Sequence, residues 1–200
     1  MDKRVVLCVS REYGSGGGEV GEKLAELLSI PIYDKKLLEK TAKDHGVPQD
    51  FIDEMDERPL GWLTAGVQNP YRADYYDAMY YVMNDRVFFL QAETIKNIAK
   101  EGSCIIIGRV AEEVLKDDPD MVSVFIHADK EDRVRRIMEK EQLTYKEAER
   151  MIKKNDKNRA NYHNFYSDRR WGECDSYDFS ISTSKFGVEG AVKAIVKLLE

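Results

Sequence analysis

The chain has 200 residues, of which 42% are hydrophobic and 34% are charged, and its formal net charge is −6. This length and composition suit one globular α/β domain, and the acidic balance excludes a broad basic surface for nucleic acid. Short apolar runs, three widely spaced cysteines and the lack of a signal-peptide pattern predict a cytoplasmic protein without a membrane partner.

The first predicted elements are a strand, a glycine-rich loop and a helix. Residues 5–9 form an apolar, β-branched run that predicts a buried strand, and apolar residues recur at helical spacing over 20–28. The loop between them contains Gly14, Ser15, Gly16, Gly17 and Gly18. Backbone N–H groups turn inward in such a loop and the helix dipole adds positive charge, so the segment is predicted to bind phosphate.

This loop departs from the usual phosphate-loop pattern, which ends in Gly-Lys-Ser/Thr. Gly18 is followed by Glu19 and Val20, so the lysine and the hydroxyl that holds magnesium are both missing. We expect the Glu19 carboxylate to point outward, because an inward carboxylate would repel phosphate. Arg11, at the end of the first strand, is the first candidate for a replacement cation, and Lys23 is the second.

A second short strand is predicted over residues 30–33 and ends at Asp34. Ligand groups gather at the carboxyl ends of parallel strands, so Asp34 is a candidate substrate contact. The alternative is that Asp34 caps the helix that begins near residue 35, as aspartate often does. Residues 35–100 are predicted to be mainly helical, with a loop-rich middle and a long helix over about 74–100.

The clearest buried strand covers residues 104–107 and is followed by Gly108 and Arg109. An arginine at a strand end suits bidentate binding of phosphate. The alternative is a surface ion pair with Glu112 or Glu113, one turn further on. Another buried strand is predicted over residues 122–128.

A charged helix is predicted over residues 131–141, and its three arginines are interpreted as part of a solvated face. Thr144 and Glu147 form a capping-box pattern that begins the next helix. Residues 153–172 then concentrate basic, amide and aromatic groups, which indicates an anion-facing lid or, alternatively, an ordinary surface helix and loop. A strand over 178–183 and a helix over 188–199 complete the chain.

The order of these elements resembles that of the nucleoside monophosphate kinases, and more specifically of the cytidylate kinase-like family. The matching stretches are residues 10–17, 33–35, 102–109, 155–162 and 177–184, which together cover nearly the whole chain. The resemblance implies a single P-loop kinase-like domain over 1–200, with a three-layer α/β/α fold and a parallel central sheet. It also implies a helical monophosphate-binding insertion over about 35–100 and a lid over about 153–175.

The resemblance further implies which residues bind the two substrates. Residues 14–18 hold the donor β-phosphate, Asp34 starts the monophosphate-binding insertion, and Arg109 contacts the acceptor phosphate. Glu19 falls at the place of the family's lysine, and Gly21 at the place of its hydroxyl residue. Lys35 stands where cytidylate kinases have a serine, which leaves the acceptor open.

The expected lid carries the remaining candidates. Asp156 and Arg159 fall on the Asp-x-x-Arg motif of the lid, and Arg159, helped by Lys153 or Arg169, closes over the transferring group. Closure keeps water away from the reaction. Arg11, Asp156 and Arg159 are therefore the candidate catalytic residues.

ATP and Mg²⁺ are the implied phosphoryl donor and ion, and no cluster of protein side chains is expected to bind a metal. Two hypotheses follow. The protein is an ATP-dependent phosphotransferase acting on a nucleoside monophosphate or another small acceptor, or it is a nucleotide-binding regulator that has lost kinase activity. A glycine turn without a ligand would not explain why strand-end and lid arginines accompany the loop. The oligomeric state stays open.

Overall fold

The computed structural model describes residues 4–55 and 70–200; at 35, 53–55 and 70–84 it describes the backbone alone. All strand pairs within these residues are parallel, and the five-stranded sheet has the order β2-β3-β1-β4-β5. The strands are β1 (Val6–Arg11), β2 (Ile32–Tyr33), β3 (Cys104–Ile107), β4 (Met121–His127) and β5 (Phe179–Ser182). Because β1 lies in the middle, the glycine loop leaves the sheet at its centre.

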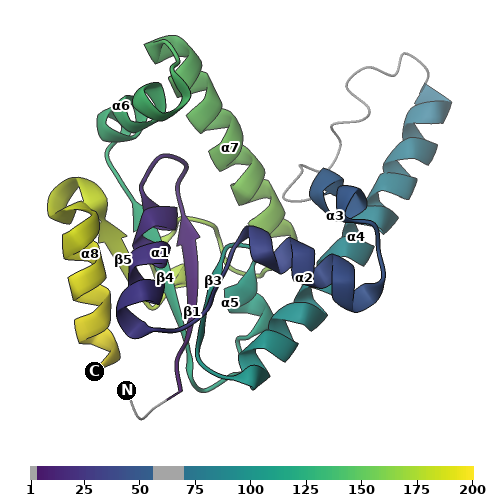
Figure 1. Ribbon diagram of the computed structural model, residues 1–200. Helices are drawn as coiled ribbons and strands as arrows, with labels where there is room; N and C mark the ends of the chain where they lie inside the picture. Colours follow the sequence, from purple (N-terminus) through teal and green to yellow (C-terminus); the bar gives the residue numbers. More distant parts are fainter. Residues whose placement is uncertain (1–3, 56–69) are drawn as a thin grey trace.

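Helices cover both faces of this sheet (Figure 1). One face carries α1 (Gly17–Leu28) and α8 (Thr183–Leu199), and the other carries α2 (Lys35–His45), α4 (Pro70–Glu101) and α5 (Ala111–Val114). The short α3 (Gln49–Met55) follows α2, and the short helix η2 (Cys174–Ser176) precedes β5. Two more helices, α6 (Lys130–Glu141) and α7 (Tyr145–Tyr166), stand beyond the end to which β1 points. The expected three-layer P-loop fold is confirmed.

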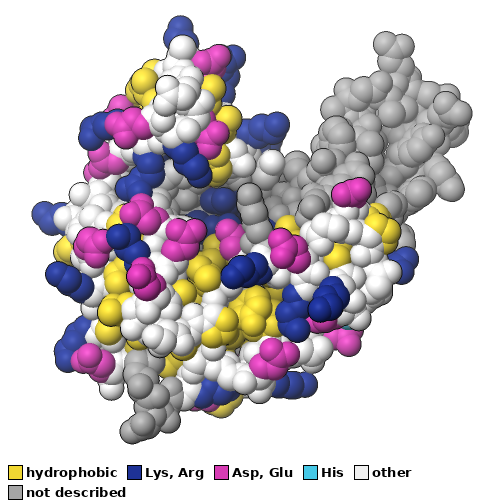
Figure 2. Space-filling view, viewed as in Figure 1, with side chains coloured by type: hydrophobic (Ala, Val, Ile, Leu, Met, Phe, Trp, Pro, Cys, Tyr) yellow, Lys and Arg dark blue, Asp and Glu magenta, His cyan; other side chains and the backbone are white. Residues whose placement is uncertain are grey.

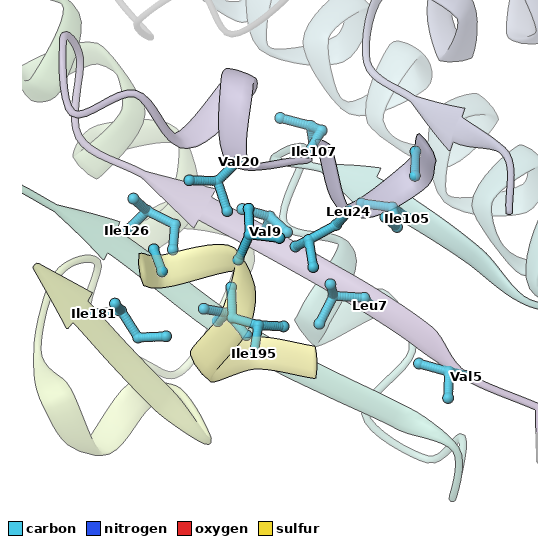
Figure 3. Packing of buried hydrophobic residues seen from close by; sticks show 14 residues of the cluster. Val5, Leu7, Val9, Val20, Leu24, Ile105, Ile107, Ile126, Ile181 and Ile195 are labelled. Atoms are coloured by element: carbon cyan, nitrogen blue, oxygen red, sulfur yellow. The ribbon is translucent and has the colours of Figure 1, made fainter. Parts of the chain in front are cut away.

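The core is divided between the two faces by the two-residue repeat of β1. Leu7 and Val9 pack with Leu24 of α1 and Ile195 of α8, all of them buried (Figure 3). The alternate residues Val6 and Cys8 pack with Leu37, Ile95 and Ile98 on the other face. Burial on both sides fixes the position of β1, and the loop that follows it therefore starts from a rigid point.

Some elements differ from the sequence predictions. The helix expected over 188–199 begins at Thr183, because a first helical turn precedes a kink at Gly187, whose φ is 66°. The segment expected to be a polar lid is helical up to Tyr166. Part of the expected insertion, residues 56–69, lies outside the described residues. No helix in the described ranges is long and apolar enough to cross a bilayer.

Candidate functional site

A cleft of about 730 Å³ opens at the carboxyl end of β1. Its walls are the glycine loop, the start of α1, the end of β2 with the start of α2, and the inner sides of α6 and α7. Charged side chains of both signs surround this hollow below α6 and α7 (Figure 2). The cleft therefore has the polar lining that a phosphorylated ligand requires.

The glycine loop bends sharply at two residues in the left-handed region, Gly14 and Gly16, each with φ of 81°. Gly14 is also pressed against α6, where an added Cβ would lie 3.0 Å from the Arg133 carbonyl oxygen. From the other side, the Thr183 hydroxyl donates a hydrogen bond of 2.6 Å to the Ser15 carbonyl. The loop is thus held by its neighbours and leads into the N-terminus of α1, whose first residues Gly17, Gly18 and Glu19 line the cleft.

The start of α1 corrects two predictions about this loop. Gly16 caps the helix and Gly17 is its first residue, and in the usual pattern the lysine directly follows that last loop glycine. The place of the lysine is therefore Gly17, not Glu19, and the place of the hydroxyl is Gly18, not Gly21. Glu19 does not point away from the site: it lines the cleft, 3.3 Å from the Arg136 guanidinium.

Arg11 and Arg109 approach Asp34 from the ends of two neighbouring strands. Their guanidinium nitrogens lie 3.7 Å and 3.5 Å from the same oxygen of Asp34. Asp34 stands at the N-cap position of α2 but makes no capping hydrogen bond with its side chain. The carboxylate therefore serves as an ion-pair partner at the strand ends rather than as a helix cap.

Arg109 sits in a strained backbone segment. The φ angles of Arg109 and Val110 are 58° and 56°, a conformation that costs about 1–3 kcal/mol for each non-glycine residue. The two glutamates of the alternative have other partners: Glu112 lies 3.0 Å from His163, and Glu113 pairs with Lys116 at 2.6 Å. Instead, the strained turn directs a nearly buried guanidinium toward Asp34.

Asp156 and Arg159 join α7 to the residues that follow β1. One oxygen of Asp156 accepts the Tyr13 backbone N–H at 2.8 Å, and the other accepts the Arg133 guanidinium at 2.5 Å. Arg159 donates to the Arg11 carbonyl at 3.1 Å and lies over the Tyr13 ring. Burial raises the pKa of that tyrosine, Glu141 adds to the rise, and Arg159 opposes it.

A cluster of buried polar side chains lies behind these arginines. Glu112 accepts a hydrogen bond from Ser10 at 3.2 Å and pairs with His163 of α7, and all three side chains are buried. Tyr177 lies beside His163, and burial raises its pKa well above the usual value. These buried side chains link β1, α5 and α7 below the cleft. The helix α7 is therefore held at two places, at Asp156 and at His163.

The other predicted cations are placed away from the cleft. Lys153 is exposed on α7 and Arg169 donates to the Ser176 carbonyl, and neither lines the cleft. Lys23 is paired with Glu189 at 2.5 Å. Three cations that line the cleft were not predicted as site residues: Lys36, Arg136 and Lys140.

The interpretation of α6 as a solvated arginine face is wrong for two of its three arginines. Arg135 is solvated, but Arg133 is held by Asp156 and Arg136 lies against Gly16, where an added Cβ would be 2.6 Å from its Nη1. A helical projection would have shown the signal, since positions 133, 136 and 140 share one face with the buried Ile137.

These features define the class of protein. A glycine loop between a central parallel strand and a helix N-terminus, surrounded by arginines, is the site of the P-loop kinase fold. Shikimate kinase from Bacteroides thetaiotaomicron has this fold, with a TM-score of 0.57, 14% identity and coverage of 98% of this chain and 99% of that chain. Shikimate kinase from Acinetobacter baumannii in complex with shikimate is similar as well, with a TM-score of 0.53, 14% identity and coverage of 99% of this chain and 93% of that chain.

The family is more specific than the fold. Residues 6–185 match the cytidylate kinase-like family, and the chain belongs to that family. An uncharacterized protein from Eubacterium ventriosum shares 33% identity with it, with a TM-score of 0.75 and coverage of 98% of both chains. No curated protein matches the chain. Family and fold together support nucleotide-dependent phosphoryl transfer in general terms and leave the acceptor open.

Proposed function

We propose that the protein transfers a phosphoryl group from ATP to a small acceptor bound at Asp34 and Arg109, with nucleoside monophosphates as the first acceptor class. The observation that carries this proposal is the meeting of a helix N-terminus, Arg11 and Asp34 at one cleft, with the Arg109 guanidinium behind them, 3.5 Å from Asp34. A structural glycine turn would not need a strained backbone that directs a buried arginine to the same place.

The donor has room on the opposite side of the glycine loop. A second hollow of about 420 Å³ lies between α6 and the start of α8, and it shares Gly14 and Arg136 with the main cleft. Phosphates held at the loop would thus lie between a space for the rest of the nucleotide and a space for the acceptor. This arrangement supports in-line transfer, which depends mainly on positioning.

The positive charge for such a transfer would come from several elements. Arg11 and Arg109 stand on the acceptor side, Arg136 stands at the loop, and Arg159 of α7 lines the cleft beside Arg11. Mg²⁺ bound to the nucleotide would neutralise phosphate charge. The described residues contain no group of three metal-ligating side chains.

The alternative is a nucleotide-binding regulator without turnover, and one observation favours it. Gly17 and Gly18 occupy the places of the usual lysine and hydroxyl, and losing a preorganised cation typically lowers the rate by about 10²-fold or more. Under this alternative, the cleft binds nucleotide and the arginines signal its presence. The cytoplasm is the compartment we propose in either case, since all three cysteines are free thiols.

The test combines binding with turnover. Titration with ATP and Mg²⁺ is expected to raise the melting temperature, and a coupled assay over nucleoside monophosphates and small hydroxyl acceptors is expected to find acceptor-dependent ADP release. Arg109→Ala is expected to lower that release by about 10²-fold while the ATP-induced shift is retained. Arg150→Ala, which removes an exposed arginine from α7, is the matched control.

Each outcome has a distinct meaning. A melting shift with no acceptor-dependent release favours the regulator. No shift at millimolar ATP contradicts nucleotide binding and, with it, both functions. Loss of release in Arg150→Ala to the same extent as in Arg109→Ala would contradict the acceptor site.

A further inference from the structure

The phosphate loop of this chain follows the usual spacing once its place is set by structure. The usual pattern is glycine, four residues, glycine, lysine, then serine or threonine. Gly16, with its left-handed backbone directly before α1, occupies the second glycine. The first glycine is then replaced by Arg11 and the lysine by Gly17. The cation and the glycine have changed places.

Steric contact explains why both changes occur together. A Cβ added at Gly17 would lie 2.5 Å from the Cβ of Arg11 and 3.0 Å from its Cγ. Rotation of the Arg11 side chain can move its Cγ but cannot relieve the contact between the two Cβ atoms, because each Cβ is fixed by its backbone. Positions 11 and 17 therefore share one space, and a side chain at one requires glycine at the other.

The side chain of Arg11 extends from this shared space into the cleft. It is only 10% exposed, and its Nη2 lies at ion-pair distance, 3.7 Å, from Asp34 on the acceptor side. A lysine at position 17 would start from the same space and extend toward the same cleft. Charge of the same sign thus enters the site from β1 instead of from α1.

We propose that Arg11 is the functional replacement for the phosphate-loop lysine and binds the transferring phosphate of a nucleoside triphosphate, with Gly17 as its obligatory partner. This inference rests on the proposed function. It assigns Arg11 a role in the donor site in addition to its contact with Asp34.

The test is a double-mutant cycle of Arg11→Gly, Gly17→Lys and the double variant, with Arg150→Ala as the exposed-arginine control. Melting temperature without ligand, ATP affinity by calorimetry and turnover are measured for each protein. Arg11→Gly is expected to lower turnover by about 10²-fold. Gly17→Lys is expected to lower the melting temperature through the clash. The double variant is expected to remove most of that loss and to recover at least about tenfold of the turnover.

Two further variants separate charge from packing and keep the test independent of folding. Arg11→Met keeps the stem without the charge and is expected to lose turnover as Arg11→Gly does. Gly17→Ala is expected to lower the melting temperature of the wild-type background much more than that of Arg11→Gly, where the two contacts with Arg11 are gone and the contact of 3.3 Å with Ile126 remains. This comparison needs no activity.

The outcomes distinguish the inference from the proposed function. Failure of the wild-type protein to bind ATP overturns both. Wild-type affinity and turnover in Arg11→Met and Arg11→Gly overturn the inference alone, as does a double variant no better than Arg11→Gly. If Gly17→Ala lowers the melting temperature equally in the two backgrounds, positions 11 and 17 do not share one space.

Discussion

Glu19 is an anion at the cleft beside the glycine loop. Its carboxylate lies 3.3 Å from Arg136 and 4.0 Å from Lys23, and about half of its side chain is exposed. Arg136 in turn lies against Gly16 at the mouth of the loop. In the ligand-free protein, the glutamate therefore holds a cation that an incoming phosphate would need, and the two anions compete for Arg136.

Glu19→Gln is expected to strengthen binding of ATP and of pyrophosphate. Because the pair is partly exposed, its contribution is at most about 1 kcal/mol, which corresponds to roughly fivefold in affinity. Calorimetry at two salt concentrations measures the effect, which is expected to shrink at high salt. Glu189→Gln releases Lys23 but not Arg136 and serves as the control. Weaker binding by Glu19→Gln would contradict the competition.

The sequence predicted some residues of the site but not others, for a physical reason. Asp34 and Arg109 are predicted at neighbouring strand ends, because the carboxyl ends of parallel strands meet at one edge of a sheet, and the structure places them 3.5 Å apart. Arg136 was missed because the three arginines of the charged helix were interpreted together as a solvated face, although a helical projection separates Arg135 from Arg133 and Arg136. Its partner Glu19 is 117 residues away in the sequence, and only the docking of α6 over the loop brings them together.

Among the elements, α7 is connected to the residues that lead into the glycine loop. Asp156 binds the Tyr13 N–H and Arg133 at the same time, and its side chain is 18% exposed. At the other level, His163 contacts buried Glu112. The geometry gives Asp156 a positioning role, in which it fixes the loop against α6 and α7.

Asp156→Asn is expected to destabilise the protein, because an amide can accept from the Tyr13 N–H only by turning its own donor toward Arg133. Hydrogen bonds to charged groups contribute about 1.5–3 kcal/mol, so the melting temperature is expected to fall by several degrees. ATP affinity is expected to fall as well, because the loop loses its support. Asp168→Asn, an exposed acid beyond α7, is the control. An unchanged melting temperature would contradict the positioning role.

Local patterns were sufficient for most elements of the fold. The strands lie within about two residues of the predicted apolar runs, and Thr144 and Glu147 form the predicted capping box at the start of α7. Burial repeats and helix caps depend on near neighbours in the sequence, so local sequence patterns predict them. The left-handed backbone of Arg109 is not predicted by a local pattern, because a non-glycine residue rarely adopts it.

Across the whole molecule, the reactivity of Cys8 and Cys104 measures how often the central sheet opens, and Cys174 lies outside the sheet. Cys8 and Cys104 are buried in adjacent strands, and Cys174 is exposed. Burial raises the pKa of Cys104 to about 11 and also raises that of Cys8. The thiolate is the reactive form, so at pH 8 only roughly a thousandth of Cys104 is reactive in the folded protein.

We expect a thiol reagent at pH 8 to modify the exposed Cys174 quickly, and to modify Cys8 and Cys104 only as the sheet opens. Cys174→Ser is expected to abolish the fast phase and leave the slow phase unchanged. Because ATP is proposed to bind the folded protein alone, ATP at 100 times its dissociation constant is expected to slow the slow phase by about 10²-fold. A remaining fast thiol in Cys174→Ser would mean that β1 or β3 opens locally. A slow phase unaffected by ATP would contradict nucleotide binding to the folded state.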